Sequence, residues 1–254
     1  IALLPPDVNE SDANFTVAGE NIRFGLVAIK GIGWGAIEEL VAERHENGLF
    51  TSFEDFCKRM SGKELNRRAV ENLIRAGAFD GMGYKRKALL QIAGAVIDSI
   101  SQAARDNIAG QYDLFGDFEA QSEASPQTIP IPDVEEFSAR DKMMMEKEVT
   151  GLYLTGHPMD EYRDAVRKVG AVPIGAILGD FAADDGPQRF ADNQYVTVAG
   201  VISTMRTRTT RNNSLMSYVQ LEDDTGTIEL LAFQRVLDNC GGYIAENAAV
   251  VARG

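Results

Sequence analysis

Cysteine and histidine are scarce in this chain of 254 residues, with two of each. Cys57 and Cys240 lie far apart, and together with His45 and His157 they show no metal-ligand spacing, which argues against a disulfide scaffold and a zinc site. No apolar run approaches the roughly 18 residues of a membrane helix. The chain starts without Met and without the basic region of a secretory signal, so we expect a piece of a longer cytoplasmic protein.

Charge is unevenly distributed along the chain. The net charge of −13 argues against a nucleic-acid partner, because Lys and Arg make the contacts to phosphates. Residues 58–87, however, hold nine basic and three acidic side chains, whereas residues 88–137 hold nine acidic side chains and Arg105 alone. This basic block followed by an acidic segment predicts a nucleic-acid contact in the first of the two stretches.

Apolar periodicity predicts helices first and strands later. We expect irregular chain over residues 1–20, a helix that ends at Lys30, and a second helix with a buried stripe that ends at Gly48. Further helical patterns occupy residues 65–75, 89–100, 137–152 and 162–169, and residues 119–132 have the composition of a linker. From Gln194 onward the pattern changes to strands, with a hairpin turn at residues 223–226.

The sequence Lys30-Gly31-Ile32-Gly33-Trp34 joins two of the predicted helices. Glycines in such a hairpin allow a phosphate to approach backbone N–H groups at the next helix N-terminus, where the helix dipole also favours an anion. This is the layout of a helix-hairpin-helix motif, which holds the DNA backbone without reading bases. The alternative interpretation is an ordinary corner between two helices with glycine caps.

A second, weaker copy of this pattern is Leu73-Ile74-Arg75-Ala76-Gly77-Ala78-Phe79-Asp80. Phe79 replaces the second hairpin glycine, so the role of this copy is either a phosphate contact or structural pairing with the first. The residues that we expect to bind duplex DNA are Lys30, Gly31, Ile32, Gly33, Trp34, Arg67, Arg68, Gly77, Lys85, Arg86 and Lys87.

The acidic segment contains the string Gln111-Tyr112-Asp113-Leu114-Phe115. Leu114 and Phe115 have no local core to enter, so we expect them to dock into an apolar pocket of a partner, with the Gln111 amide fixing the register. The alternative is that the two apolar side chains fold back onto the preceding helix.

The strands after Gln194 suit a small barrel of the OB type. We expect residues 205–213 to form its long first loop, which carries Arg206, Arg208 and Arg211 and suits a single-stranded phosphate backbone. Tyr218 or Phe233 could stack on a base, although packing in the barrel core is the favoured interpretation for Phe233. The Arg side chains on the loop could alternatively be merely solvated.

We find no catalytic constellation in the sequence. The carboxylate pairs Asp184-Asp185 and Asp223-Asp224 are each followed by turn-forming residues, and His157 before Pro158 has no evident catalytic partner. The prediction is therefore that these residues bind nucleic acid and protein, with no catalytic residue, metal ion or cofactor of their own.

With these residues in view, the chain resembles the alpha subunits of bacterial DNA polymerase III along nearly its whole length. The resemblance rests on five stretches: Pro5-Pro6-Asp7-Val8-Asn9, Ile22-Arg23-Phe24-Gly25-Leu26 with the first hairpin, residues 73–80, Gly151-Leu152-Tyr153-Leu154-Thr155-Gly156-His157-Pro158, and the strands that end in Glu222-Asp223-Asp224-Thr225-Gly226. The domain order is similar to that of the replicative, Gram-negative type.

The resemblance implies a multidomain protein, α-helical and then β. Its parts are the end of the fingers at residues 1–20, a tandem helix-hairpin-helix domain at 21–105, an acidic linker with the clamp-binding motif at 106–135, linker helices at 136–190, and an OB-fold domain at 191–254 that stops before its last strand. The implied partners are double-stranded DNA, the single-stranded template, the beta sliding clamp and the rest of the holoenzyme.

The same resemblance implies a parent chain that is a DNA-directed DNA polymerase with Mg²⁺ in a palm domain absent here, so we expect this stretch to be inactive alone. Two rival interpretations stay open: a stand-alone helix-hairpin-helix and OB repair factor, and a structural linker whose basic block only packs against other polymerase domains.

Overall fold

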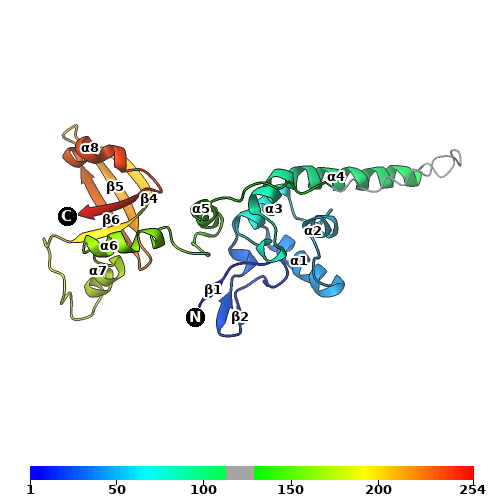
Figure 1. Cartoon of the computed structure of the whole chain (residues 1–254), viewed down its shortest axis with the longest axis horizontal. Coiled ribbons are helices and arrows are strands. Elements are labelled where there is room, and N and C mark those ends of the chain that lie inside the picture. The colour runs from blue at the N-terminus through cyan, green and yellow to red at the C-terminus, as the bar shows by residue number, and fades with distance from the viewer. Residues whose placement is uncertain (113–128) are drawn as a thin grey trace. The chain divides into compact units, whose positions relative to one another are not determined.

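The computed structural model describes residues 1–112 and 129–254, with side chains up to Arg105 in the first of these ranges. Contacts divide the chain into two compact units, residues Ile1–Thr155 and Gly156–Gly254. The first unit is mainly helical and the second is built on an antiparallel sheet (Figure 1). This agrees with the α-then-β class that the sequence predicts.

The first unit begins with a small sheet. Strand β3 (Asn21–Arg23) pairs in parallel with β1 (Leu3–Leu4) and antiparallel with β2 (Thr16–Ala18), and a 3-10 helix, η1 (Leu26–Ala28), follows. The predicted helix that ends at Lys30 is therefore wrong. Gly25 explains the difference, because its backbone lies so close to Asn14 and Phe15 that a Cβ atom would overlap them, which ties this segment to residues 1–20.

Helices make up the rest of this unit. They are α1 (Trp34–Asn47), α2 (Phe53–Arg59), α3 (Arg67–Arg75), the 3-10 helix η2 (Asp80–Met82), α4 (Arg86–Tyr112) and α5 (Ala139–Thr150). Helix α1 buries Ile37 and Leu40 and ends at Gly48 in the left-handed region, as its apolar stripe predicts. Helix α4 continues to Tyr112, past the linker boundary that the sequence predicts at residue 106.

The core of this unit contains an aromatic cluster between α2 and the turn after α3. The Phe79 ring meets the rings of Phe53 and Phe56 edge-on, at centroid distances of 5.2 and 5.0 Å, and Phe50 meets Phe56 at 5.0 Å. All four side chains are buried. Phe79, which replaces the second hairpin glycine, is thus a core residue, and this explains why a large apolar side chain occupies that position.

The second unit starts with η3 (Asp160–Tyr162), α6 (Arg163–Lys168) and α7 (Ile174–Phe181). A sheet with the order β6-β5-β4-β7 follows, formed by β4 (Thr197–Thr209), β5 (Leu215–Glu222), β6 (Thr227–Phe233) and β7 (Ala249–Arg253); α8 (Gln234–Cys240) and η4 (Gly241–Tyr243) lie between β6 and β7 in the sequence. A register shift between Ile202 and Thr204 interrupts β4, as expected where a strand bends in a curled sheet.

The turn at residues 223–226 is confirmed. The N–H of Asp223 donates to the carbonyl of Gly226, and the Asp223 carboxylate accepts from the N–H groups of Thr225, Gly226 and Ile174. The predicted long loop at residues 205–213 is wrong, since β4 continues to Thr209 and places Arg206 and Arg208 on the strand. Only Arg211 of the three Arg side chains lies in the connecting turn.

Candidate nucleic-acid interface

The first hairpin, residues 30–33, joins η1 to α1 and is held from two sides. The Lys30 N–H donates to the Val149 carbonyl at 2.7 Å, and the Asn72 side chain donates to the Lys30 carbonyl at 2.7 Å. Gly31 has φ +78°, a conformation that favours glycine. Helices α3 and α5 therefore fix the path of this hairpin, although their residues lie far from it in the sequence.

The backbone N–H groups of the first hairpin remain available. Within the described part of the chain, the N–H groups from Gly31 to Trp34 have no hydrogen-bond acceptor, and Gly33 caps α1 without a side-chain bond. The first turn of α1 contains no acidic residue, and Trp34 is 49% exposed. Such free donors at the positive end of a helix dipole form a site for an anion.

Two charged side chains flank this site. The guanidinium of Arg68 lies close to Gly31, since a Cβ atom there would be 4.0 Å from the Arg68 Nε. The Glu64 carboxylate lies beside Gly35, where it would overlap an added Cβ atom. The Lys30 ammonium donates to the Glu148 carbonyl at 2.8 Å and stays at the surface.

The second hairpin, residues 76–80 after α3, has the opposite character. Most of its N–H groups are bonded locally: Gly77 to the Ile74 carbonyl, Ala78 to the Leu73 carbonyl and Asp80 to the Gly77 carbonyl, at 2.9 to 3.0 Å. The Ala78 carbonyl also accepts from the N–H of Val8 at 2.9 Å. Because of these bonds, few backbone N–H donors at this hairpin remain for an external phosphate.

The sequence predicts that Arg86 and Gly77 contact DNA, but the Arg86 side chain and Gly77 are buried in the fold. Arg86 is 1% exposed, and its guanidinium donates to the Arg75 carbonyl, the Asp80 carboxylate and the Glu146 carboxylate. Gly77, at φ +85°, lies directly under this guanidinium, and an added Cβ atom would overlap it. The Arg86 side chain thus joins the two sides of the second hairpin through hydrogen bonds to Arg75 and Asp80.

Glu146 on α5 completes this buried network. It is fully buried and accepts from the N–H groups of Leu154 and Thr155 at 2.9 and 3.0 Å, in addition to Arg86 at 2.9 Å. A buried charge requires such a complete set of partners. The network joins the second hairpin to α5 and to the chain that follows it.

Lys85 and Lys87 are in contact with residues from the acidic segment. The Lys85 ammonium pairs with Asp133 at 2.8 Å, and this raises the pKa of Lys85 and lowers that of Asp133. The Glu136 carboxylate accepts from the N–H groups of Arg86 and Lys87 at the start of α4. Burial would raise the pKa of Glu136, but these N–H donors and that of Phe137 hold it below its usual value.

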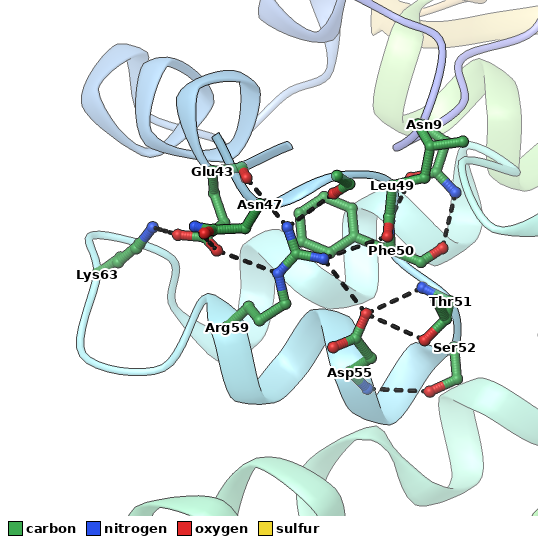
Figure 2. A network of polar contacts seen from close by, with 11 residues as sticks. Asn9, Glu43, Asn47, Leu49, Phe50, Thr51, Ser52, Asp55, Arg59 and Lys63 are labelled. Atoms are coloured by element: carbon green, nitrogen blue, oxygen red, sulfur yellow. Dashed lines mark hydrogen bonds and ion pairs between the residues drawn. The ribbon is translucent and has the colours of Figure 1, made fainter. Parts of the chain in front are cut away.

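Figure 2 shows how other members of the basic block are neutralised internally. Glu43 on α1 binds Arg59 at 3.1 Å and also binds Lys63, and Arg59 further contacts Asp55 at 3.4 Å. The hydrogen bonds from Lys63, Arg59 and Asn47 lower the pKa of Glu43 to about 2. This network joins α1 to α2 and to the loop before α3.

The remaining cations of the block complete the pattern. Lys58 pairs with Glu54, and Arg67 and Arg75 both pair with Glu71. Arg68 and Lys87 are the two of the nine cations that form no ion pair with an acidic residue in the described ranges. The local positive charge that the sequence indicates is thus largely neutralised in the fold, and Arg68 beside the first hairpin is the clearest exception.

A second candidate surface lies on the outward face of the sheet in the other unit. Register places Arg208 opposite Met216 and Arg206 opposite Tyr218, and on the next strand Phe233 opposite Met216 and Leu231 opposite Tyr218. Directly opposed residues share one face of a sheet, so these six side chains form one surface. The Arg208 guanidinium lies 5.9 Å from the Tyr218 ring centroid.

The interpretation of Phe233 as a core residue is wrong. Phe233 is 57% exposed and Leu231 48% exposed, because they alternate with Ala232, which faces the core. An aromatic and aliphatic surface that carries two Arg side chains has the composition of a platform for single-stranded nucleic acid. The alternation of side chains in β6 indicated this arrangement, but the sequence alone does not show which face is covered.

Two family models match the chain. Residues 1–89 match a helix-hairpin-helix motif, and residues 196–254 match an OB-fold nucleic acid binding domain. The chain is 34% identical over 253 residues to the DNA polymerase III subunit alpha of Mycobacterium tuberculosis, covering 99% of this chain and 21% of that protein. Over 99% of its length, the chain is therefore related to a stretch of the DNA polymerase III alpha subunits.

Other alpha subunits show the same extent of similarity. That of Deinococcus radiodurans is 34% identical over 239 residues, or 93% of this chain and 17% of that protein, and that of Xylella fastidiosa is 33% identical over 265 residues, or 100% and 21%. The chain thus spans about a fifth of the length of these alpha subunits.

The residues predicted to bind the clamp lie at the end of α4 and beyond it. Gln111 falls within α4, whereas Leu114 and Phe115 lie outside the described residues. No group of His, Cys, Asp or Glu side chains in the described ranges could hold a metal ion, and no helix there is long and apolar enough to cross a membrane. Asp223 is saturated by backbone donors in its turn, as expected.

Several residues that shape the interface were not identified from the sequence. Asn72, Glu136 and Glu146 act on hairpins and helix ends from distant positions, so no local pattern reveals them. Asn72 is the one that a sequence pattern could have revealed, because it is a polar residue among the apolar positions that α3 buries.

Proposed function

We propose that this chain is the part of a bacterial DNA polymerase III alpha subunit that holds nucleic acid, with the first hairpin on the duplex backbone. The observation that carries the proposal is the contrast between free N–H groups at residues 31–34 and bonded N–H groups in the second hairpin. Backbone donors bind phosphate oxygens without regard to base identity. Lys30, Trp34 and Arg68 supply the surrounding surface, and Arg67, whose guanidinium lies beside Gly94 on α4, is proposed to contact the duplex from that position.

Gly33 allows a sharp test of this role. It has the extended backbone of a helix N-cap, and a Cβ atom there would meet nothing within 4 Å. Gly33→Asp should therefore cap and preserve α1 while its carboxylate fills the phosphate site. We expect duplex affinity, measured by fluorescence anisotropy, to fall at least about tenfold, the effect of roughly 1.4 kcal/mol.

Gly33→Asn is the matched control, because asparagine caps the helix with the same shape and no charge. It should lose much less affinity than Gly33→Asp, and both variants should unfold at least as late in urea as the unchanged chain. Arg68→Ala should weaken binding to all duplex sequences and reduce the slope of log affinity against log salt by about one. Unchanged duplex binding in Gly33→Asp would contradict the role of the first hairpin.

We propose that the outward sheet face, with Arg206, Arg208 and Tyr218, binds the single-stranded template, and that Arg211 in the adjoining turn supports it. Tyr218→Ala and Phe233→Ala should each weaken binding of a single-stranded oligonucleotide by about 1–3 kcal/mol, the range for one stacked base. Tyr243→Ala, at a 75% exposed aromatic residue outside the sheet, should have little effect. Equal losses in all three variants would argue against a specific platform.

We further propose that Gln111, Leu114 and Phe115 bind the beta sliding clamp, in keeping with their place in the acidic segment. Leu114→Ala combined with Phe115→Ala should abolish binding to immobilised clamp and leave duplex affinity unchanged. Retained clamp binding in this double variant would remove the motif from the proposal.

The proposed setting is template-directed DNA synthesis by the intact alpha subunit within the polymerase III holoenzyme, in the bacterial cytoplasm. In this proposal, polymerisation and its Mg²⁺ ions belong to a palm domain outside these residues. The similarity along 99% of this chain to alpha subunits favours this proposal over a stand-alone repair factor.

A further inference from the structure

The N-terminus of α4 is covered by residues 129–137, here called the return segment. It approaches the second hairpin with two carboxylates, Asp133 and Glu136, that bind around Lys85 and the first N–H groups of α4. The Lys87 ammonium lies 5.7 Å from the ring centroid of Phe137 in the same segment. Lys85, Lys87 and the first N–H groups of α4 could each attract an anion, and all of them contact the return segment.

Glu136 accepts hydrogen bonds at the N-terminus of α4, and a helix N-terminus is a place where a phosphate can bind. Its Oε2 accepts from the Arg86 N–H at 2.8 Å, and its Oε1 accepts from the Lys87 N–H at 3.1 Å. A carboxylate and a phosphate compete for such donors, because both offer paired anionic oxygens to the positive end of a helix. At the first hairpin, no carboxylate in the described chain accepts from the N–H groups of residues 31–34.

Asp133 is held much more loosely than Glu136. It is 96% exposed and its partner Lys85 is 46% exposed. Exposed ion pairs of this kind contribute little and weaken with salt. A DNA backbone, with its dense row of phosphates, can therefore replace Asp133 at Lys85 at small cost.

We propose that Asp133 and Glu136 form an internal phosphate mimic that masks a second backbone-phosphate site, made of Lys85, Lys87 and the N-terminus of α4, and so lowers duplex affinity. The inference rests on the proposed function, since the ligand is the backbone of the duplex that the first hairpin holds. It explains why the Lys85 ammonium and the first N–H groups of α4, all in the predicted DNA-binding block, are bound by carboxylates that lie 48 to 50 positions later in the chain.

Neutral substitutions in the return segment test the mimic. Asp133→Asn should raise duplex affinity about two- to fivefold at low salt, and Glu136→Gln, which keeps one acceptor at the helix end, should raise it further. Freed cations should also steepen the slope of log affinity against log salt by up to about one per new phosphate contact. Fluorescence anisotropy with one duplex over a salt series measures both quantities.

Glu135→Gln is the matched control, because Glu135 is an exposed acid between the two and its substitution removes the same charge. It should change affinity less than twofold and leave the salt slope unaltered. Lys85→Ala in the Asp133→Asn background should cancel the gain. If Asp133→Asn changes the duplex affinity and the salt slope no more than Glu135→Gln does, the proposed mimic is overturned. This outcome does not depend on Glu136→Gln, which could disturb the start of α4.

Adding Gly33→Asp to these variants separates this inference from the proposed function. If Gly33→Asp lowers affinity and Asp133→Asn does not raise it, the first hairpin retains its role and only the mimic fails. If Gly33→Asp has no effect while Asp133→Asn raises affinity, the second site alone binds the duplex, and the proposed role of the first hairpin fails.

Discussion

The two hairpins of the helical unit follow the same sequence pattern and end in opposite states. The first leaves the N–H groups of residues 31–34 without acceptors among the described residues, whereas the second bonds most of its N–H groups locally and holds the buried guanidinium of Arg86. Each has a glycine with positive φ, Gly31 or Gly77. The comparison shows that the motif specifies the turn, while the partners of the turn decide whether its donors are available.

The second hairpin should therefore matter most for folding, and this is the largest effect we expect. Arg86→Met leaves the fully buried Glu146 without its cation and should lower the free energy of unfolding by about 3–5 kcal/mol. Trp34 is the single tryptophan, so its fluorescence in urea reports on this unit. Arg68→Met at the first hairpin should change stability by less than about 0.5 kcal/mol; similar losses in both variants would remove the distinction.

Alanine at the two positive-φ glycines should separate the hairpins further. Gly31→Ala strains the backbone and should cost about 1–2 kcal/mol of unfolding free energy. Gly77→Ala adds an overlap with the buried Arg86 guanidinium and should cost more than about 3 kcal/mol. The same urea titration measures both, and equal costs would show that Arg86 can move aside.

The network at Glu43, between α1 and α2, should respond to pH. Its carboxyl pKa of about 2 lies below the ordinary value of 4.5, so the folded state binds fewer protons than the unfolded state between these values. The stability that Glu43 contributes is present above pH 4.5 and is lost as pH falls towards 2. The stability difference between the unchanged chain and Glu43→Gln should shrink over this range; a constant difference would contradict the prediction.

Glu64 beside the first hairpin should show the smallest effect. Its carboxylate lies near the first turn of α1, where it repels a phosphate without accepting from the hairpin N–H groups. Glu64→Gln should raise duplex affinity about two- to threefold at low salt. Glu46→Gln near the other end of α1 is the control, and an equal gain there would indicate a general charge effect.

Much of the architecture could be predicted from local sequence. The glycine hairpin at residues 30–33, the buried stripe of α1 and the turn at residues 223–226 all depend on residues close in the chain. The failed predictions have a different origin. Residues 21–23 join a sheet with residues 3–4 and 16–18, and β4 continues to Thr209 because β5 pairs along it.

The sequence by itself determined the order of a helix-hairpin-helix region and an OB region, and the places where the chain turns. Only the tertiary structure decided which cations and aromatic rings face the solvent. Arg86 meets Glu146 at a separation of 60 residues and Lys85 meets Asp133 at a separation of 48. The reason is physical: turns depend on local backbone preferences, whereas the accessibility of a charge depends on which distant groups desolvate or pair with it.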